Sequence, residues 1–134
     1  MKSKLFFRVF IPLALGAALY VLLCPEAFVS RGFYALTGLR PPEIACGGAA
    51  LRLVRNHLAD MLWAWALTCC VSAVLGRGKG YAAAAVAAGT GIFVELAQQA
   101  LGVGTLDWLD AALELAAAAA AGAYIVYSER RERQ

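Results

Sequence analysis

Charged side chains are scarce in this chain. Asp, Glu, Lys and Arg make up 16% of its 134 residues, whereas hydrophobic residues make up 62% and the mean hydropathy is +0.68. A soluble domain of this length cannot bury so much apolar side chain in one core. The composition therefore excludes an ordinary soluble domain and indicates a small integral membrane protein.

Metal-ligand patterns are missing as well. None of the four cysteines, Cys24, Cys46, Cys69 and Cys70, belongs to a Cys-x-x-Cys motif, and His57 is the single histidine. Cys69 and Cys70 fall mid-span, where a thiol behaves as a small hydrophobe, and a lone histidine makes no metal site. We therefore expect neither a metal nor a cofactor. Cys24 and Cys46 would both face the outer side of the membrane, and the sequence leaves open whether they pair.

A signal-peptide cleavage site is also lacking. Lys2 and Lys4 precede an apolar run, as in a secretory signal, but the run is about 20 residues long and no small-x-small site follows it. We expect an uncleaved first span.

Long apolar runs, in contrast, are abundant. A helix needs about 20 mainly apolar residues to cross the hydrocarbon core of a bilayer. Four stretches meet this length, at about 5–24, 57–76, 81–101 and 106–127. We predict an all-α fold, in which residues 1–134 form a single domain: a four-span transmembrane helical bundle with a short amphipathic helix in the first outer loop.

The connections between the spans support this arrangement. Glu26 to Leu39 mixes aromatic and polar residues, which favours a short helix lying on the outer surface. The basic turn at 77–80 makes spans two and three an antiparallel hairpin, and the turn at 102–105 does the same for spans three and four. Thr105 is expected to cap the last helix, with Asp107 in its first turn.

Basic residues predict the orientation. Eight of the twelve Lys and Arg fall on the side of both termini, and four fall on the other side: Arg31, Arg40, Arg52 and Arg55. By the positive-inside rule we expect both termini in the cytoplasm of a bacterium, with the chain in its cytoplasmic membrane. Since these residues sit at span ends, the net charge of +3 does not imply a nucleic-acid partner.

Acidic and amide side chains interrupt the otherwise apolar spans. Ionisable groups inside lipid-spanning helices are costly and usually face a protein interior or a wet cavity. One stripe of such residues closes the third span and another opens the fourth, each within about 100° of arc on its helix. Both stripes would lie in the outer half of the bundle, and Asp60 and His57 at the start of the second span would join the same layer.

We predict an outward-facing acidic pocket at this layer. The predicted ligand-binding residues are Arg52, Arg55, Asn56, Asp60, Glu95, Gln98, Gln99, Asp107, Asp110 and Glu114. His57 is interpreted as an interfacial side chain and is not included. Gln98 and Gln99 have an alternative interpretation, as hydrogen-bonding residues between helices.

Two short motifs within this set carry a family resemblance. Glu95 and Gln98 match an E-x-x-Q that closes one span, and Asp107 and Asp110 match a D-x-x-D-x-x-x-N that opens the next. The C-terminal third therefore resembles the VanZ-like family of small bacterial membrane proteins, which is associated with teicoplanin resistance. The arginine usual in the turn is replaced, and Glu114 stands at the asparagine position, so the pocket of this chain is more acidic. The resemblance implies a place in the cell envelope and a site, without naming a reaction.

Four functions follow from these features. The leading one is an envelope protein that binds a lipid headgroup, a peptide or a glycopeptide-like ligand: the acids would contact cationic groups, and Arg52 and Arg55 would hold phosphate or carboxylate. The second is an intramembrane hydrolase or transferase with Glu95 or Asp110 as general base, although no nucleophile motif accompanies them. The third is a cation- or proton-coupled carrier, which would need a dimer because four spans are few. The fourth is a scaffold whose polar residues only orient helices. Membrane lipids are the expected partners, and a homo-oligomer stays open.

Overall fold

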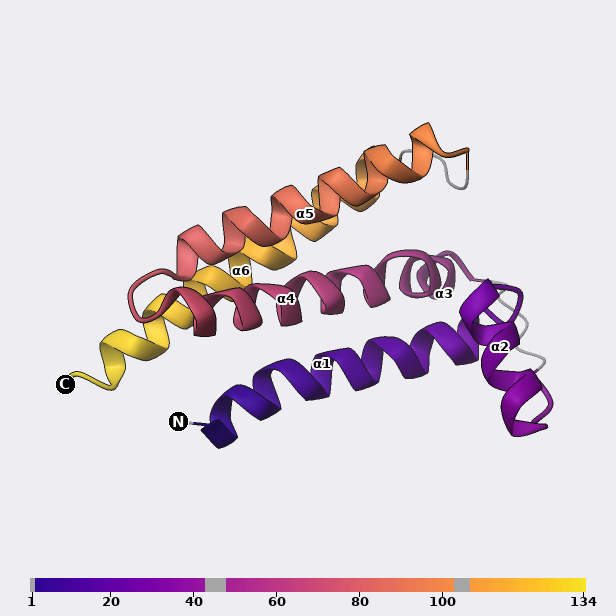
Figure 1. Ribbon diagram of the computed structural model, residues 1–134, viewed down its shortest axis with the longest axis horizontal. Helices are drawn as coiled ribbons and strands as arrows, with labels where there is room; N and C mark the ends of the chain where they lie inside the picture. Colours follow the sequence, from indigo (N-terminus) through magenta and orange to yellow (C-terminus); the bar gives the residue numbers. More distant parts are fainter. Residues whose placement is uncertain (1, 43–47, 103–106) are drawn as a thin grey trace.

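A computed structural model describes residues 2–42, 48–102 and 107–134 of the chain. Within these ranges the protein is helical and contains no strand (Figure 1). The helices are α1 (Lys2–Leu23), α2 (Phe28–Thr37), α3 (Ala49–Leu53), η1 (Val54–Leu58), α4 (Ala59–Leu75), α5 (Gly80–Ala100) and α6 (Trp108–Arg131). The segments α3, η1 and α4 form one continuous helix, in which η1 is a single π-helical turn.

Four helices are long and apolar enough to cross a membrane. Their spans are Phe6–Leu23, Leu51–Leu75, Gly80–Ala100 and Trp108–Arg131. Many large apolar side chains are exposed on the outside of the bundle, while the largest fully buried side chains are those of Thr68, Cys69 and Ser30. An apolar exterior around a core of small residues suits a lipid solvent. The predicted four-span helical bundle is confirmed, and the chain is a multi-pass membrane protein.

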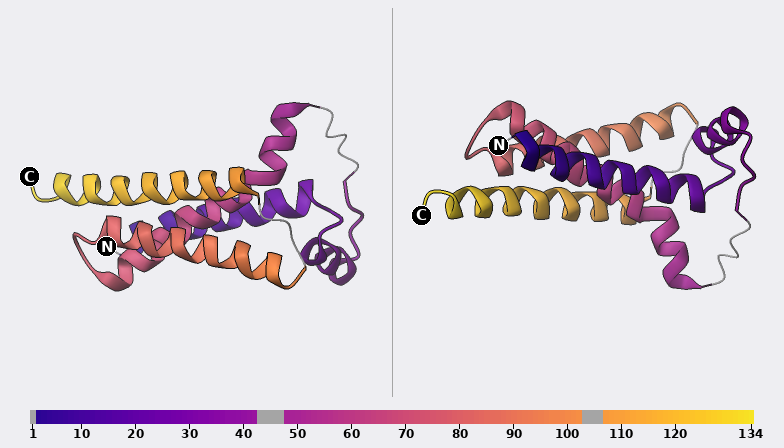
Figure 2. Two further views of the ribbon diagram at one scale, coloured as in Figure 1. Left: turned by 90° about the horizontal axis from the view of Figure 1, so that it is seen from above. Right: turned by 90° about the horizontal axis from the view of Figure 1, so that it is seen from below.

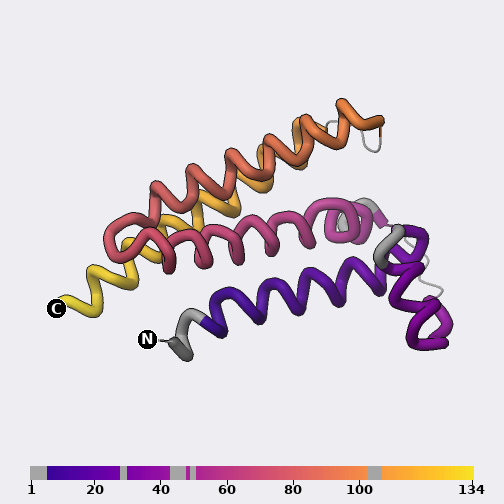
Figure 3. The backbone as a smooth tube through the Cα atoms, in the orientation of Figure 1, coloured from indigo at the N-terminus to yellow at the C-terminus, as the bar shows by residue number. Residues whose placement is uncertain are grey.

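The bundle has two ends that differ in structure (Figures 1 and 2). We call the end where α1 begins and α6 ends the terminal end. The opposite end carries α2, α3, the end of α5 and the start of α6, and we call it the loop end. Between the two ends, α4 packs against α1, α5 and α6, and α5 packs against α6 as an antiparallel pair (Figure 3). The functional layer predicted from the sequence therefore falls at the loop end.

The helix α2 confirms the predicted amphipathic helix of the first loop. The Tyr34 hydroxyl donates a hydrogen bond to the Val21 carbonyl at 3.0 Å, and the Ser30 hydroxyl donates one to the Tyr20 carbonyl at 3.4 Å. The Val21 carbonyl is one that the last turn of α1 leaves without a helical partner, whereas the Tyr20 carbonyl also accepts from the Cys24 amide at 2.9 Å. The helix ends at Gly38, whose positive φ of 68° suits glycine. Two hydroxyl groups thus hold α2 against the end of α1.

Small side chains form the contact between α5 and α6. Gly80, Ala84 and Ala88 recur every four residues on α5, and Ala118 and Gly122 do so on α6; all five are buried. A Cβ on Gly122 would lie 2.8 Å from the Gly80 carbonyl oxygen, so the two backbones are in direct contact. We call this contact the alanine seam. Small residues of this kind let lipid-embedded helices approach closely.

Three boundaries differ from the sequence expectations. The second transmembrane helix starts near Ala49 rather than at 57, because the residues of α3 and η1 continue it with helical geometry. The last helix extends beyond 127 to Arg131; there the Glu129 carboxylate accepts a hydrogen bond from the Gly78 amide at 2.7 Å. Its N-cap is Asp107, whose carboxylate accepts from the Leu109 amide at 2.9 Å. Thr105, the expected cap, lies outside the described residues, as does Cys46.

Candidate functional site

The site is organised around His57, which stands on the π-helical turn η1. Its side chain is buried, with the residue only 7% exposed, and Nδ1 lies 2.9 Å from Asp110 Oδ1 on α6. A π-turn adds a residue to the helix and often occurs at functional sites, where it re-aims a side chain. The helix also bends at this turn, as helices commonly do at π-bulges (Figure 2). The turn therefore joins the second transmembrane helix to the start of the fourth through a partly buried hydrogen bond.

Three further carboxylates, one from each of α4, α5 and α6, lie near this bond. Asp60 of α4 interacts electrostatically with Asp110, Glu95 and His57. Glu114 of α6 interacts with Asp60, Asp110 and Glu95. The structure thus brings the acids of α4, α5 and α6 together instead of distributing them around the bundle. We call Asp60, Glu95, Asp110, Glu114 and His57 the acid cluster.

The Glu114 carboxylate lies in the space that Gly91 leaves free because it has no side chain. The residue is 9% exposed, and a Cβ on Gly91 of α5 would overlap its carboxylate. Gly91 continues the stripe of small residues that forms the alanine seam, so the seam ends where the first carboxylate enters it. Glu114 makes no hydrogen bond with another described residue. Among the described residues no fully enclosed side-chain oxygen or nitrogen lacks a hydrogen-bond partner, so the Glu114 carboxylate still borders open space.

Counter-charges for the acids are few. Within the described ranges, neither Arg52 nor Arg55 forms an ion pair with an acid of the cluster. Arg52 is exposed on α3, and the Arg55 guanidinium donates to the Asn56 side-chain oxygen at 3.1 Å. These three predicted residues flank the cluster at the loop end without neutralising it. His57 is the basic side chain in hydrogen-bond contact with an acid there.

The other predicted residues stand at the edge of the site. Gln98 and Gln99 are exposed on the last turns of α5 and make no hydrogen bond to another described helix, so the interhelical bonds considered for them are not seen. Asp107 is exposed, and its carboxylate serves as the N-cap of α6. These three exposed side chains lie at the loop end, on the last turns of α5 and at the start of α6.

Sequence reasoning missed two residues of the site. His57 was interpreted as interfacial, yet it is buried against Asp110. His57 precedes Asp60 by three residues, which places both side chains on one face of the helix. This spacing was the sequence signal that could have assigned His57 to the site. Gly91 was not singled out, because nothing in the sequence shows which residue of α6 lies opposite it.

In the parts of the chain that the structure describes, no three His, Cys, Asp or Glu side chains are placed to hold one metal ion. The carboxylates of the acid cluster interact electrostatically, but they are not positioned as the ligands of one metal ion.

Comparison with protein-family models, curated proteins and solved structures gives no match for this chain. The resemblance to the VanZ-like family remains a prediction from two motifs. Function must therefore be argued from the site, since a helical bundle by itself does not specify one.

Proposed function

We propose that the chain is a VanZ-like protein of the bacterial cell envelope whose acid cluster binds the cationic group of an envelope lipid, a peptide or a glycopeptide-like ligand. One observation carries the proposal: four carboxylates from three helices share one region, where His57 is hydrogen-bonded to one of them, Asp110. Charges removed from water are stable only when they are paired. A ligand ammonium group would supply the missing positive charge through charge-assisted hydrogen bonds.

The distribution of basic residues supports an outward site. The terminal end carries eight of the twelve Lys and Arg, and the loop end carries four. In the cytoplasmic membrane of a bacterium, the positive-inside rule then places the termini in the cytoplasm and the acid cluster toward the outer side. Arg52 and Arg55, at the same end, are available for a phosphate or carboxylate of the ligand.

Glu95→Gln is the sharpest test of this function, because Glu95 makes no hydrogen bond with another described residue and its loss should spare the fold. The matched control is Glu26→Gln, which removes an exposed acid at the loop end outside the cluster. In a teicoplanin-sensitive bacterium, the wild type and Glu26→Gln should lower teicoplanin susceptibility at equal expression. Glu95→Gln should lose that protection by at least half. Unchanged protection in Glu95→Gln would contradict the proposal.

A second candidate is supported by the bond between His57 and Asp110. A carboxylate that holds one imidazole nitrogen leaves the other nitrogen oriented as a general base. In the described ranges no hydroxyl or thiol bonds to His57, so an intramembrane hydrolase of this design would have to use water as its nucleophile. Purified protein incubated with phospholipid vesicles, with the products followed by mass spectrometry, tests this function. Release of headgroup or fatty acid that is lost in His57→Gln would favour the enzyme over the binding protein.

A further inference from the structure

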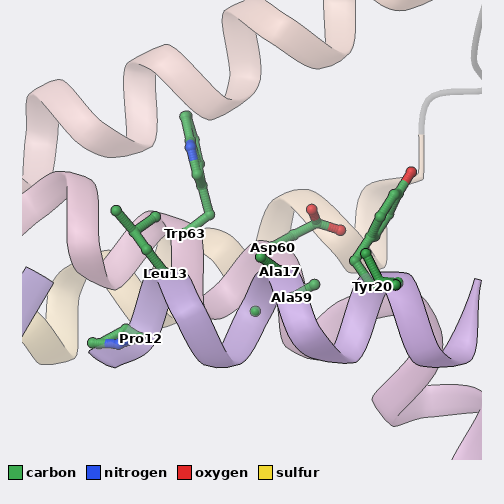
Figure 4. Close-up of a pocket in the computed structure, with 9 residues that line it drawn as sticks. Pro12, Leu13, Ala17, Tyr20, Ala59, Asp60 and Trp63 are labelled. Carbon is green, nitrogen blue, oxygen red and sulfur yellow. The ribbon is translucent and has the colours of Figure 1, made fainter. Parts of the chain in front are cut away.

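A cavity of about 270 Å³ lies between α1 and α4, at one side of the acid cluster (Figure 4). Its walls include Leu13, Ala17 and Tyr20 of α1 and Asp60 and Trp63 of α4. Leu13, Ala17, Tyr20 and Trp63 are exposed on the surface of the bundle. That surface faces lipid in a membrane, so the cavity opens sideways toward the bilayer.

The cavity follows from how α1 packs. At Gly16 the two helices approach closely, because a Cβ there would lie 3.4 Å from the Ala59 carbonyl oxygen. Beside this close contact, Ala17 and Ala59 leave space between the larger side chains of Leu13, Tyr20 and Trp63. A void of this kind loses dispersion contacts unless something fills it. Apolar walls make an alkyl chain a better occupant than water.

One carboxylate interrupts the apolar wall. Asp60 lines the cavity and also belongs to the acid cluster, where Asp110 and Glu95 add further negative charge. Asp60 makes no hydrogen bond with another described residue. In Figure 4 its carboxylate and the Tyr20 ring extend to the same side of α1. The cavity therefore has an apolar body and one anionic end.

The anionic end lies close to headgroup level. Tyr20 is three residues from the end of the α1 span, which is about 4.5 Å along the helix axis. Tyrosine is typical of this interfacial depth. Asp60 interacts electrostatically with Tyr20, so the two side chains lie near each other at this end of the cavity. A lipid with its chain in the cavity would bring its headgroup to Asp60 without leaving the bilayer.

We propose that the cavity between α1 and α4 binds a membrane lipid with a primary-amine headgroup, whose ammonium contacts Asp60 and whose acyl chain lies along Leu13, Ala17 and Trp63. This inference rests on the proposed function, because the same acids supply the negative charge. It narrows that function to a lipid that enters sideways from the bilayer.

Quenching of Trp63 fluorescence by brominated lipid chains tests the inference. The protein, with Trp65→Phe and Trp108→Phe to leave Trp63 as the single tryptophan, is placed in nanodiscs that contain brominated phosphatidylethanolamine or brominated phosphatidylglycerol at equal mole fraction. We expect at least twofold stronger quenching by the amine lipid. Asp60→Asn should abolish the preference between headgroups. Two results would overturn the inference. One is equal quenching by both lipids in the single-tryptophan protein that retains Asp60. The other is a preference for the amine lipid that persists in Asp60→Asn.

A second variant distinguishes the contribution of the cavity to lipid binding from that of the carboxylates. Ala17→Phe fills the cavity and leaves every carboxylate in place, so it should lower quenching by the amine lipid at least twofold. Ala18→Phe, on an exposed position of α1 that does not line the cavity, is the matched control and should change nothing. Unchanged quenching in Ala17→Phe would overturn the inference even if Glu95→Gln still abolished protection against teicoplanin, since that result concerns the acid cluster alone.

Discussion

The alanine seam and the contact between α1 and α4 pair helices in opposite ways. In the seam, Gly80 and Gly122 bring two backbones together, and alanines fill the rest. Between α1 and α4 one glycine makes a close contact, and larger side chains around it leave a cavity. Helices in lipid gain little from the hydrophobic effect, so their stability comes from close packing. The helices α5 and α6 are therefore in direct backbone contact, whereas the contact between α1 and α4 leaves a cavity.

The largest expected effect comes from breaking the seam. Gly122→Ala would place a Cβ 2.8 Å from the Gly80 carbonyl oxygen and 2.9 Å from the Ala84 Cβ, so the helices must separate. We expect a loss of about 1–3 kcal/mol in the free energy of unfolding, as for overpacked cores. The measurement is loss of helicity in a denaturing-detergent titration. Gly89→Ala is the control, because a Cβ there meets no neighbouring atom within 4 Å. Equal stability of the two variants would show that the seam is not tightly packed.

The next effect tests the hydrogen bond at the loop end. His57→Ala removes the partner of Asp110 and leaves a largely buried carboxylate without its hydrogen bond. The free energy of unfolding should fall by about 1–2 kcal/mol in the same titration. The reason is that a buried acceptor without a hydrogen bond has lost its contact with water and gained nothing in return. His57→Gln retains a donor and should recover part of the loss. No difference between the alanine and glutamine variants would contradict a hydrogen-bonding role for His57.

A smaller effect is expected where the seam meets the acid cluster. Gly91→Ala puts a methyl group where the Glu114 carboxylate lies, and that carboxylate is the flexible end of a side chain. We expect the fold to lose less than about 1 kcal/mol, while protection against teicoplanin falls as in Glu95→Gln. Stability and cell-based protection, measured in parallel, separate the two effects. Full protection in Gly91→Ala would show that the position of Glu114 does not matter for binding.

The smallest effect is expected at the terminal end. Arg77 and Glu132 form an exposed ion pair at 3.4 Å between the turn before α5 and the end of α6. Exposed pairs contribute about 0–1 kcal/mol. Arg77→Gln should therefore change the unfolding free energy by less than about 0.5 kcal/mol, less than any of the changes above. A larger loss would mean that this ion pair, in addition to the seam, holds α5 against α6.

Much of the fold follows from sequence periodicity, but the site follows only in part. The apolar runs, the basic turn at 77–80 and the amphipathic segment predict the four spans and α2. Helical spacing also places Asp110 and Glu114 on one face of their helix. Periodicity cannot show how one helix is rotated against another, and for that reason the π-turn that aims His57 at Asp110 was not foreseen. The cavity beside Asp60 depends on the distance between α1 and α4, which no single segment encodes.

The direct test of the account is a double-mutant cycle between Asp60 on α4 and Glu114 on α6. Asp60→Asn, Glu114→Gln and the double variant are compared with the wild type by unfolding free energy. If the acids of separate helices share one chamber, the effect of neutralising one depends on the other, and the coupling should exceed about 0.5 kcal/mol. Additive effects would mean that the two carboxylates are independent and would contradict the account.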